Sequence, residues 1–504
     1  MCIESGNEDG AVMRRTGTKL VLLAMAAMLT ASAQSADPFG YSIVTPRPIS
    51  PAEGTTTPNA QETQRQNPYL GSVPAKNTGA TIEMSLQDAI RRGLRYNLGV
   101  VESAQASADV RAERLRALSA LLPQLTAAAR QGYDNISLKE IGLKLPPIPG
   151  FPGLPSTTGG FGYQDARISF SQSIYNGALR NEYRARKSDE QASELSVQDS
   201  RDVVVFAVAT AYLQALASAA RVDTAKARLA SARELEDQTG NRVKNEVSPE
   251  IDSIRAQVER QTAEQGLTDA ANQLEKDKLT LARITGLAVD QKFDVTDRLA
   301  YRAIQGLSSE AATEKALRSR SDLRSAEASA ESARLTLRAR KAQRTPAISI
   351  SANYGGGGVN IGNFNQVYAI SADVSVPIYT GGRIRADITQ AQADLARRQA
   401  EYEDLKGRVA YDVRIAWLDL SASDSSVTVA QRNKALADRA LLQSRDRYEN
   451  GVTNYLEVVQ AQETDTIASE NYIRSLFSYE AAMVSLARAM GGAETELPRL
   501  LGGK

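Results

Sequence analysis

Apolar and polar residues alternate with a period of two in residues 168–174 and 370–378. The apolar positions there are Ile168, Phe170, Ile174, Ile370, Ala372, Val374, Val376 and Ile378. This period is typical of a β-strand with one apolar face and one polar face. In a soluble protein the apolar face would lie in a core, whereas in an exported protein the same pattern describes a barrel with lipid outside and water inside. The pattern alone leaves both readings open.

Two much longer stretches, residues 179–245 and 384–450, contain no proline and one glycine each. At 1.5 Å per residue, a helix of about 65 residues is roughly 100 Å long. Heptad spacing of apolar residues occurs in two series, Ile388, Leu395, Tyr402, Val409 and Leu267, Leu274, Leu281. Such heptads with many alanines predict closely packed coiled-coil helices.

Four shorter helices are predicted at residues 86–121, 250–285, 313–344 and 455–490. Each has about 35 residues, so two of them stacked end to end match one long helix. A wall of long helices interleaved with stacked shorter pairs predicts a cylinder and not a globule.

The second half of the chain repeats the first. Ile174–Gly177 reads Ile-Tyr-Asn-Gly and Ile378–Gly381 reads Ile-Tyr-Thr-Gly, and an offset of about 205 residues persists to the ends of both halves. The offset is larger upstream, where a Pro/Gly-rich insert at residues 145–162 lengthens the first half. Each half has the order short helix, strand, loop, strand, long helix, turn, short helix, which predicts four strands per chain.

The repeated motif marks two strand-to-helix corners. Gly177 and the pair Gly381 and Gly382 are expected to permit the backbone torsions needed to pass directly from a strand into a helix. Pro377 lacks an N–H donor and is expected to end strand pairing just before the second corner.

Composition excludes several classes of function. The 60 basic and 59 acidic side chains leave no charge bias toward nucleic acid. Histidine is absent and the single cysteine is Cys2, which excludes His-based catalytic triads, thiolate metal clusters and disulfide frameworks. No motif places the remaining titratable residues in a cleft, so we expect neither an enzyme nor a cofactor or metal site.

The N-terminus has the pattern of a secretory signal peptide. A basic segment from Met13 precedes an apolar run, and Ala31-Ser32-Ala33 follows, so cleavage is expected after Ala33 or alternatively after Ala36. The apolar run is too short for a transmembrane helix, and no later segment is expected to form one.

The expected organisation has six parts. They are a signal peptide (1–33), a flexible Pro/Thr/Gln-rich extension (34–80), a first repeat (81–290), a linker (291–312), a second repeat (313–492) and a C-terminal tail (493–504).

Together these features resemble the TolC family of outer-membrane factors, the exit ducts of efflux pumps and type I secretion systems. The resemblance covers residues 86–492 and rests on the tandem halves, the paired corners and one turn pattern. The pattern consists of Tyr448, Gly451, Thr453, Leu456, Glu457, Val458, Val459, Ala461 and Gln462. It implies a homotrimer in the outer membrane, with a twelve-stranded barrel and a coiled-coil tunnel in the periplasm. It also implies a periplasmic adaptor and an inner-membrane pump or ABC transporter as partners.

The resemblance further implies two functional regions at the periplasmic tip. The turns that carry Val247, Ser248, Gly451, Val452 and Thr453 would contact the adaptor. Family members narrow the pore with two acidic residues one helical turn apart, and these positions fall here on Glu457 and Gln460. Only Glu457 is acidic, so a doubled carboxylate ring is not expected, and Glu457 can equally be an ordinary solvated charge. Polar pairs around Asp252 and Arg255 are expected to hold the tip closed.

Two functional hypotheses follow. The first is a passive trimeric export duct, and the alternative is a structural coiled-coil protein or adhesin of the cell envelope. The alternative accounts for the heptads but not for the alternating strands or the doubled corner. The sequence does not distinguish drug efflux from protein secretion and does not identify the exported substrate.

Overall fold

Two very long helices run through the computed structural model, which describes residues 67–137, 157, 159–303, 308–359 and 363–501. They are α5 (Gly177–Lys244) and α9 (Arg383–Glu449), which confirms the helices predicted at residues 179–245 and 384–450. The described residues belong to one unit, residues 60–504. The predicted signal peptide, most of the N-terminal extension and most of the insert at residues 145–162 lie outside the described residues.

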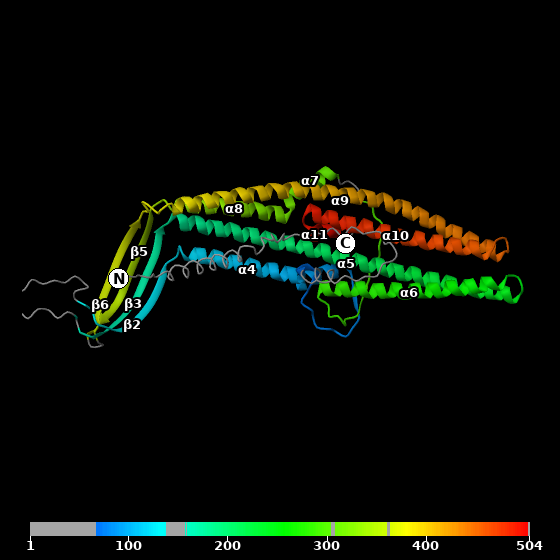
Figure 1. Cartoon of the computed structure of the whole chain (residues 1–504), viewed down its shortest axis with the longest axis horizontal. Helices are drawn as coiled ribbons and strands as arrows, with labels where there is room; N and C mark the ends of the chain where they lie inside the picture. The colour runs from blue at the N-terminus through cyan, green and yellow to red at the C-terminus, as the bar shows by residue number, and fades with distance from the viewer. Residues whose placement is uncertain (1–66, 138–156, 158, 304–307, 360–362, 502–504) are drawn as a thin grey trace, which may run out of the picture. The chain divides into compact units, whose positions relative to one another are not determined.

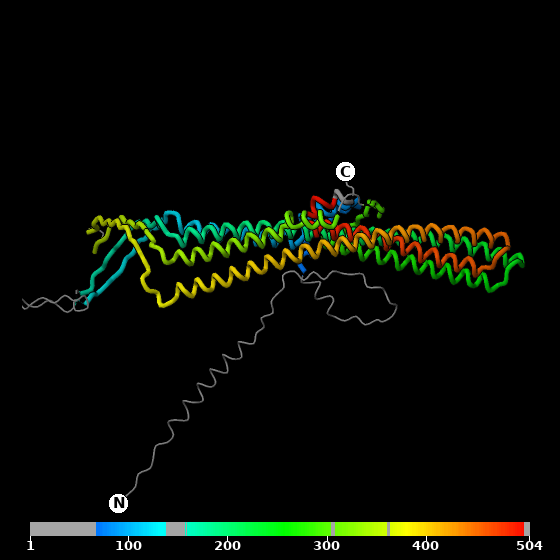
Figure 2. Tube along the Cα trace, turned by 90° about the horizontal axis from the view of Figure 1, so that it is seen from above, coloured from blue at the N-terminus to red at the C-terminus, as the bar shows by residue number. Residues whose placement is uncertain are grey.

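Shorter helices stack in pairs beside the long ones, as the lengths predicted. Helices α4 (Leu98–Ser119) and α6 (Glu250–Thr285) follow each other along α5, and α8 (Ser321–Ala342) and α10 (Tyr455–Met490) follow each other along α9 (Figure 1). Both α8 and α10 also pack against α5 and so join the two halves. Seen at right angles, the helices lie side by side in a thin layer (Figure 2).

The predicted helices at residues 86–121 and 313–344 are each broken in two, so these two predictions were wrong. Helix α3 (Leu86–Tyr96) ends at Asn97, and α7 (Ser309–Ser319) ends at Arg320, where the backbone is extended in both cases. The fully buried Asn97 side chain accepts from the Gly99 N–H at 2.9 Å and donates to the Tyr69 carbonyl at 2.7 Å. Asparagine breaks the helix here because its side chain competes for backbone hydrogen bonds.

One four-stranded antiparallel sheet lies at one end of the helices, on the left in Figure 1. Its order is β2 (Gln124–Asp134), β3 (Phe161–Tyr175), β5 (Ala347–Gly358) and β6 (Asn365–Ser375). This agrees with the four strands predicted from the repeat. Strand β6 ends at Ser375, two residues before Pro377, so Val376 and Ile378 continue the apolar pattern without belonging to the strand.

The register of the sheet places small polar residues on one face. In one row across the strands, Gln124 lies opposite Ser171, Ser171 opposite Ser351, and Ser351 opposite Ser371. The neighbouring row on the other face consists of Leu125, Phe170, Ala352 and Ile370. The sheet therefore has one face lined by hydroxyls and one apolar face.

A small parallel pair of strands and the N-terminal segment were not predicted. Strand β1 (Ile82–Met84) pairs with β4 (Phe293–Val295), which lies in the predicted linker. Residues 67–80, assigned from the sequence to a flexible extension, are part of the fold. The short helix η1 (Pro68–Leu70) is followed by hydrogen bonds from Val73 N–H to the Tyr96 carbonyl and from Ala75 N–H to the Gly286 carbonyl, both 2.9 Å.

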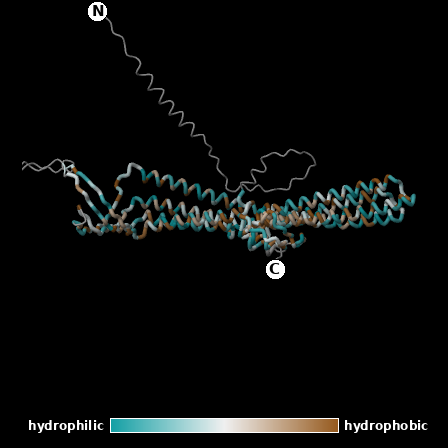
Figure 3. Tube along the Cα trace, turned by 90° about the horizontal axis from the view of Figure 1, so that it is seen from below, coloured by the Kyte–Doolittle hydropathy of each residue, from teal (hydrophilic) through white to brown (hydrophobic). Residues whose placement is uncertain are grey.

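The hydrophobic core is concentrated where the broken helices meet the long ones. Hydrophobic positions gather around the middle of the helices (Figure 3). The largest cluster contains Val204, Val208 and Tyr212 of α5, all fully buried. Among the described residues, helix α5 is both long enough and apolar enough to cross a membrane. The expectation that no segment after the N-terminus has this composition was therefore wrong. Most of that stretch is buried in this core, which accounts for its apolar composition.

Candidate functional site

The turns at the far end of the long helices have the same backbone conformation. In each turn one residue is left-handed, Glu246 with φ 58° after α5 and Gly451 with φ 71° after α9. The Val247 N–H donates to the Arg242 carbonyl and the Val452 N–H to the Arg447 carbonyl, both at 2.8 Å. This is the Schellman arrangement, in which a left-handed residue lets the last carbonyls of a helix find donors. Glycine suits the position in the second turn, and the first turn keeps the conformation with a glutamate.

The residues predicted to contact an adaptor lie on these two turns. Val247 and Val452 are exposed, with 62% and 67% of their surface accessible. Ser248 accepts a hydrogen bond from Arg242 Nε at 3.4 Å, and the Thr453 hydroxyl donates to the Glu457 carboxylate. The two valines are therefore exposed apolar residues of the turns themselves, whereas Ser248 and Thr453 also support the turns.

The four residues predicted to form the pore constriction do not come together as one group within the chain. Glu457 lies 3.6 Å from Arg447 of α9, measured from carboxylate oxygen to guanidinium nitrogen. Gln460, one turn further along α10, is exposed. Asp252 and Arg255 pair with each other along α6 at 3.5 Å. Within the chain these two residues thus pair along one helix, and their role in closing the tip stays a prediction.

Arg242, which the sequence analysis missed, is one of the residues that join the two tip hairpins within the chain. Its Nη1 donates to the carbonyls of Tyr448 and Glu449 at 3.0 and 3.3 Å, and its guanidinium lies 4.8 Å from the centre of the Tyr448 ring. Arg242 therefore caps the C-terminus of α9 from the neighbouring helix, which is favourable because the end of a helix carries partial negative charge. Only the presence of Tyr448 in the turn pattern pointed to this contact.

Tyr448 and Tyr455 fill the interior between the hairpins. Their rings meet edge to face with centroids 6.2 Å apart, and both are nearly fully buried. Burial, with a smaller contribution from Glu259, raises the pKa of Tyr455 to about 12. Leu235 of α5 and Ala256 of α6 belong to the same buried cluster, so the two hairpins form one packed tip.

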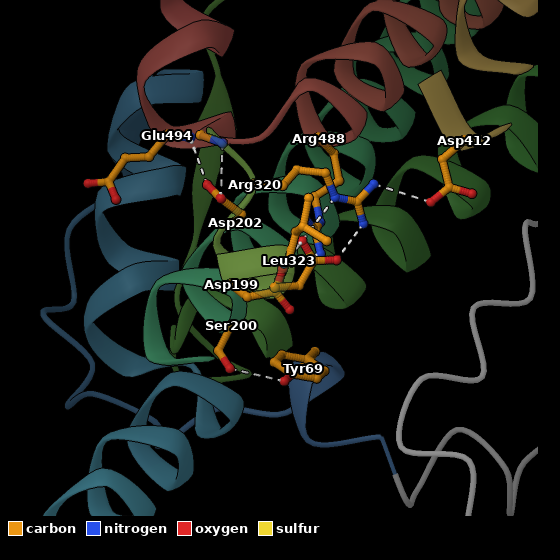
Figure 4. Close-up of polar contacts among 11 residues, drawn as sticks. Tyr69, Asp199, Ser200, Asp202, Arg320, Leu323, Asp412, Arg488 and Glu494 are labelled. Atoms are coloured by element: carbon orange, nitrogen blue, oxygen red, sulfur yellow. Dashed lines mark hydrogen bonds and ion pairs between the residues drawn. The ribbon is translucent and has the colours of Figure 1, made fainter. Parts of the chain in front are cut away.

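A second polar site lies at the break between α7 and α8 (Figure 4). Arg320 is 7% exposed, and its Nε and Nη2 donate to the two carboxylate oxygens of Asp322 at 3.0 and 2.6 Å. Its Nη1 donates to Asp412 of α9 at 3.2 Å. Burial by itself would raise the pKa of Asp322, but the hydrogen bonds and charge of Arg320 outweigh it and lower that pKa. Arg320 therefore fixes the helix break to α9.

The C-terminal residues complete this junction. Residues 493–501 form helix α11 (Ala493–Leu501) in place of the tail predicted from the sequence. Asp202 of α5 accepts from the N–H groups of Gly492 and Glu494 at 3.1 and 3.4 Å, so it caps α11 (Figure 4). Gly491 has φ 79°, and a Cβ there would lie 2.9 Å from the Arg320 Cα, so both torsion and space require glycine.

Asp199 is the remaining buried carboxylate of the junction. It accepts from Arg488 Nη2 at 2.6 Å and is 5% exposed. Burial raises the pKa of both Asp199 and Asp202, and the charge of Arg488 opposes the increase in each case. The junction therefore joins α5, α7, α8, α9, α10 and α11 through buried charge.

The two corner motifs differ in detail. Gly381 and Gly382 have φ values of 60° and 88°, in the left-handed region, and a Cβ on either would meet nothing within 4 Å. Gly177 is instead the first helical residue of α5 and has no positive φ, so the passage from β3 into α5 does not need glycine for its torsions. A Cβ on Gly177 would lie 3.3 Å from the Ala342 Cβ, so close packing against the end of α8 is what favours glycine.

Comparison with known proteins matches residues 78–287 and 312–492 to the outer membrane efflux protein family. The chain belongs to this family. The matched residues contain both long helices, the four-stranded sheet and the two tip turns. The protein is thus an outer-membrane efflux channel component and not an enzyme, with its helical portion in the periplasm.

Several relatives support the same assignment. The chain is 25% identical over 344 residues to the pyoverdine export outer membrane protein OpmQ of Pseudomonas putida, which covers 65% of this chain and 70% of the relative. It is 24% identical over 341 residues to the outer membrane protein TolC of Vibrio cholerae, covering 65% and 76% of the two chains. The solved structure of the Vibrio cholerae outer membrane protein VceC has the same fold, with a TM-score of 0.67, 19% identity and coverage of 81% and 96%.

Protonation of Glu480 is expected to make the stability of the fold depend on pH. Glu480 of α10 is 6% exposed and accepts from the Ala300 N–H at 2.9 Å. Burial raises its pKa from 4.5 to about 7, although the Ala300 N–H and Arg302 oppose this. Between these values the folded chain binds more protons than the unfolded chain. The free energy of unfolding should therefore fall by about 3 kcal/mol as the pH rises through this window.

Urea unfolding at a series of pH values tests this expectation. Glu480→Gln should be more stable than the unmodified protein at pH 8 and should show a smaller decline between pH 5 and 7.5. Glu463→Gln, an exposed position on the same helix, is the matched control and should keep the decline. An unchanged pH profile in Glu480→Gln would show that another group is responsible.

Proposed function

We propose that three copies of this chain close into a passive exit channel through the outer membrane. The observation that carries the proposal is that, among the residues that the structure describes, both edge strands of the sheet, β2 and β6, lack a partner on their outer side. Open edges with exposed N–H and C=O groups cannot lie in a membrane, whereas a closed barrel has no edges. Three four-stranded sheets would give twelve strands.

The two outermost helices of the layer, α9 and α6, each carry a row of exposed apolar side chains. Exposed large apolar side chains occur along α9 at Tyr411, Leu418, Val429, Leu436 and Leu442, each between 56% and 65% exposed. On α6, at the opposite edge of the layer, Ile251, Ile254 and Val258 are about half exposed. Apolar rows of this length at both edges are consistent with coiled-coil contacts between neighbouring copies.

The apolar face of the sheet fits a lipid environment. Leu125, Ile168, Ile370 and Val374 are between 48% and 78% exposed, all on this face. Strand β6 has 11 residues, which matches the 9–11 residues of a tilted transmembrane strand. The hydroxyl-lined face would then surround the water-filled lumen.

We further propose that the tip turns dock a periplasmic adaptor, through which an inner-membrane pump or ABC transporter supplies energy and cargo. Glu457 would line the narrow periplasmic mouth, with Gln460 replacing a second acid. The relatives include an outer membrane protein of pyoverdine export and one of a toluene efflux pump, so the cargo of this chain is left open.

Arginine substitutions on the two faces of β6 test the channel. Ile370 lies in the middle of the strand, so Ile370→Arg should destabilise the inserted protein by about 2–4 kcal/mol because the charge would lie near the centre of the bilayer. Val374→Arg should cost about 0–1 kcal/mol because Val374 is the last residue but one of the strand. Both values are measured by urea unfolding from lipid vesicles.

Ser371→Arg is the matched control, since Ser371 is adjacent in sequence but lies on the hydroxyl-lined face. It should cost much less than Ile370→Arg. Equal tolerance of arginine at positions 370 and 371, together with a protein that stays soluble without detergent, would favour the coiled-coil adhesin instead.

A further inference from the structure

Three charged residues gather on the hydroxyl-lined face of the sheet, in the part that lies farther from the helices. We call this part the outer part of the sheet. Arg130 of β2 lies directly opposite Asp165 of β3, and Arg167 follows two residues along β3 on the same face. We call these residues the arginine cluster. The rows of this face that lie nearer the helices carry mostly hydroxyls and amides, so the cluster is a distinct feature of the proposed lumen.

The cluster is held in place by contacts within the sheet. Arg167 Nη2 lies 2.5 Å from Asp165 Oδ2, and the Arg130 guanidinium lies 5.8 Å from the centre of the Tyr163 ring. Tyr163 in turn lies over Gly132, where a Cβ would be 2.4 Å from the Tyr163 ring. Asp165 is thus paired with Arg167, and the charge of Arg130 is positioned by an aromatic ring but not neutralised.

The arrangement leaves donors and room for a ligand. The Arg167 side chain is 38% exposed, and among the described residues its one ion pair is the contact with Asp165. The residues opposite Arg167 and Asp165 on β5 are Gly355 and Gly357, so no side chain covers the cluster from that strand.

The surplus charge of the cluster is positive. Two arginines and one aspartate give a net charge of +1 per chain, and hence +3 in a trimer. The other acids on this face are distant: Asp134 is four residues beyond Arg130, and Asp373 lies in the row of Ser173, six residues from Arg167. At about 3.3 Å per residue these separations are roughly 13 and 20 Å, beyond the screening length of about 8 Å at physiological salt.

Resting on the channel proposed above, we infer that Arg130 and Arg167 form an anion-binding station in the outer part of the lumen. Guanidinium groups with free donors bind carboxylate and phosphate groups strongly. The station favours the exit of cargo that carries such groups, and it is separate from Glu457 at the periplasmic mouth.

Block of the channel by citrate tests the station. The detergent-purified protein is inserted into planar bilayers in 0.1 M KCl, and citrate is added on the side that carries the loops of the sheet. Citrate should block the unmodified channel, and Arg130→Gln with Arg167→Gln should weaken the block about tenfold or more through the loss of charge-assisted hydrogen bonds. Asp165→Asn should strengthen the block because it frees Arg167.

Arg338→Gln with Arg344→Gln is the matched control, since it removes the same two positive charges from exposed residues outside the strands. It should leave the block unchanged. Conductance without citrate block, or equal block in the double variant and the unmodified protein, would overturn the anion-binding station and leave the channel intact. Absence of any conductance in the unmodified protein would reject the channel itself and the station with it.

Discussion

Replacing Val452 with glutamate is expected to abolish export while leaving the protein folded and inserted in the membrane. Val452 is 67% exposed at the tip, and its backbone N–H closes the turn at 2.8 Å from the Arg447 carbonyl whatever its side chain is. The substitution therefore leaves the turn intact. It places a charge on an apolar point that a partner would have to bury, and an unpaired buried charge is strongly unfavourable.

The effect is measured in a strain that lacks this chain, by growth on the compounds to which its loss sensitises the cells. Val452→Glu should fail to restore growth, as if no protein were present, and its amount in the outer membrane should be normal. Val289→Glu is the matched control, because Val289 is 82% exposed but lies on the loop after α6, away from the tip. Full export by Val452→Glu would place the adaptor contact elsewhere.

Arg320→Met is expected to destabilise the fold by about 3–5 kcal/mol. Arg320 is 7% exposed and forms paired hydrogen bonds with Asp322 and one with Asp412. Its removal leaves the carboxylate of Asp322 buried without its partner, and breaking a buried pair in this way costs several kcal/mol. The loss should appear as a lower urea midpoint by circular dichroism.

Arg318→Met controls for the loss of an arginine two residues earlier. Arg318 is 76% exposed and pairs only along its own helix with Glu314, so its removal should cost less than about 1 kcal/mol. A second variant, Arg320→Met with Asp322→Leu, should recover part of the stability because it removes the unpaired charge. A midpoint for Arg320→Met equal to that of Arg318→Met would show that the junction does not depend on this ion pair.

The sequence by itself determined the repeated architecture. Helices α6 and α10 have the predicted bounds, because a long proline-free heptad pattern admits few alternatives. The end of β6 just before Pro377 also follows from local chemistry, since proline cannot donate to the next ladder bond. These features depend on neighbours in sequence, so the sequence contains them.

Tertiary structure decided the features that depend on distant residues. The sequence around Arg320 continues a helical pattern, and the helix breaks because Asp322, Asp412 and the close approach of Gly491 fix an extended backbone there. Docking of α11 onto Asp202, pairing of β1 with β4, and the cap that Arg242 provides for α9 likewise join segments far apart in the chain. No local pattern specifies such contacts, because their free energy arises only when the elements are packed together.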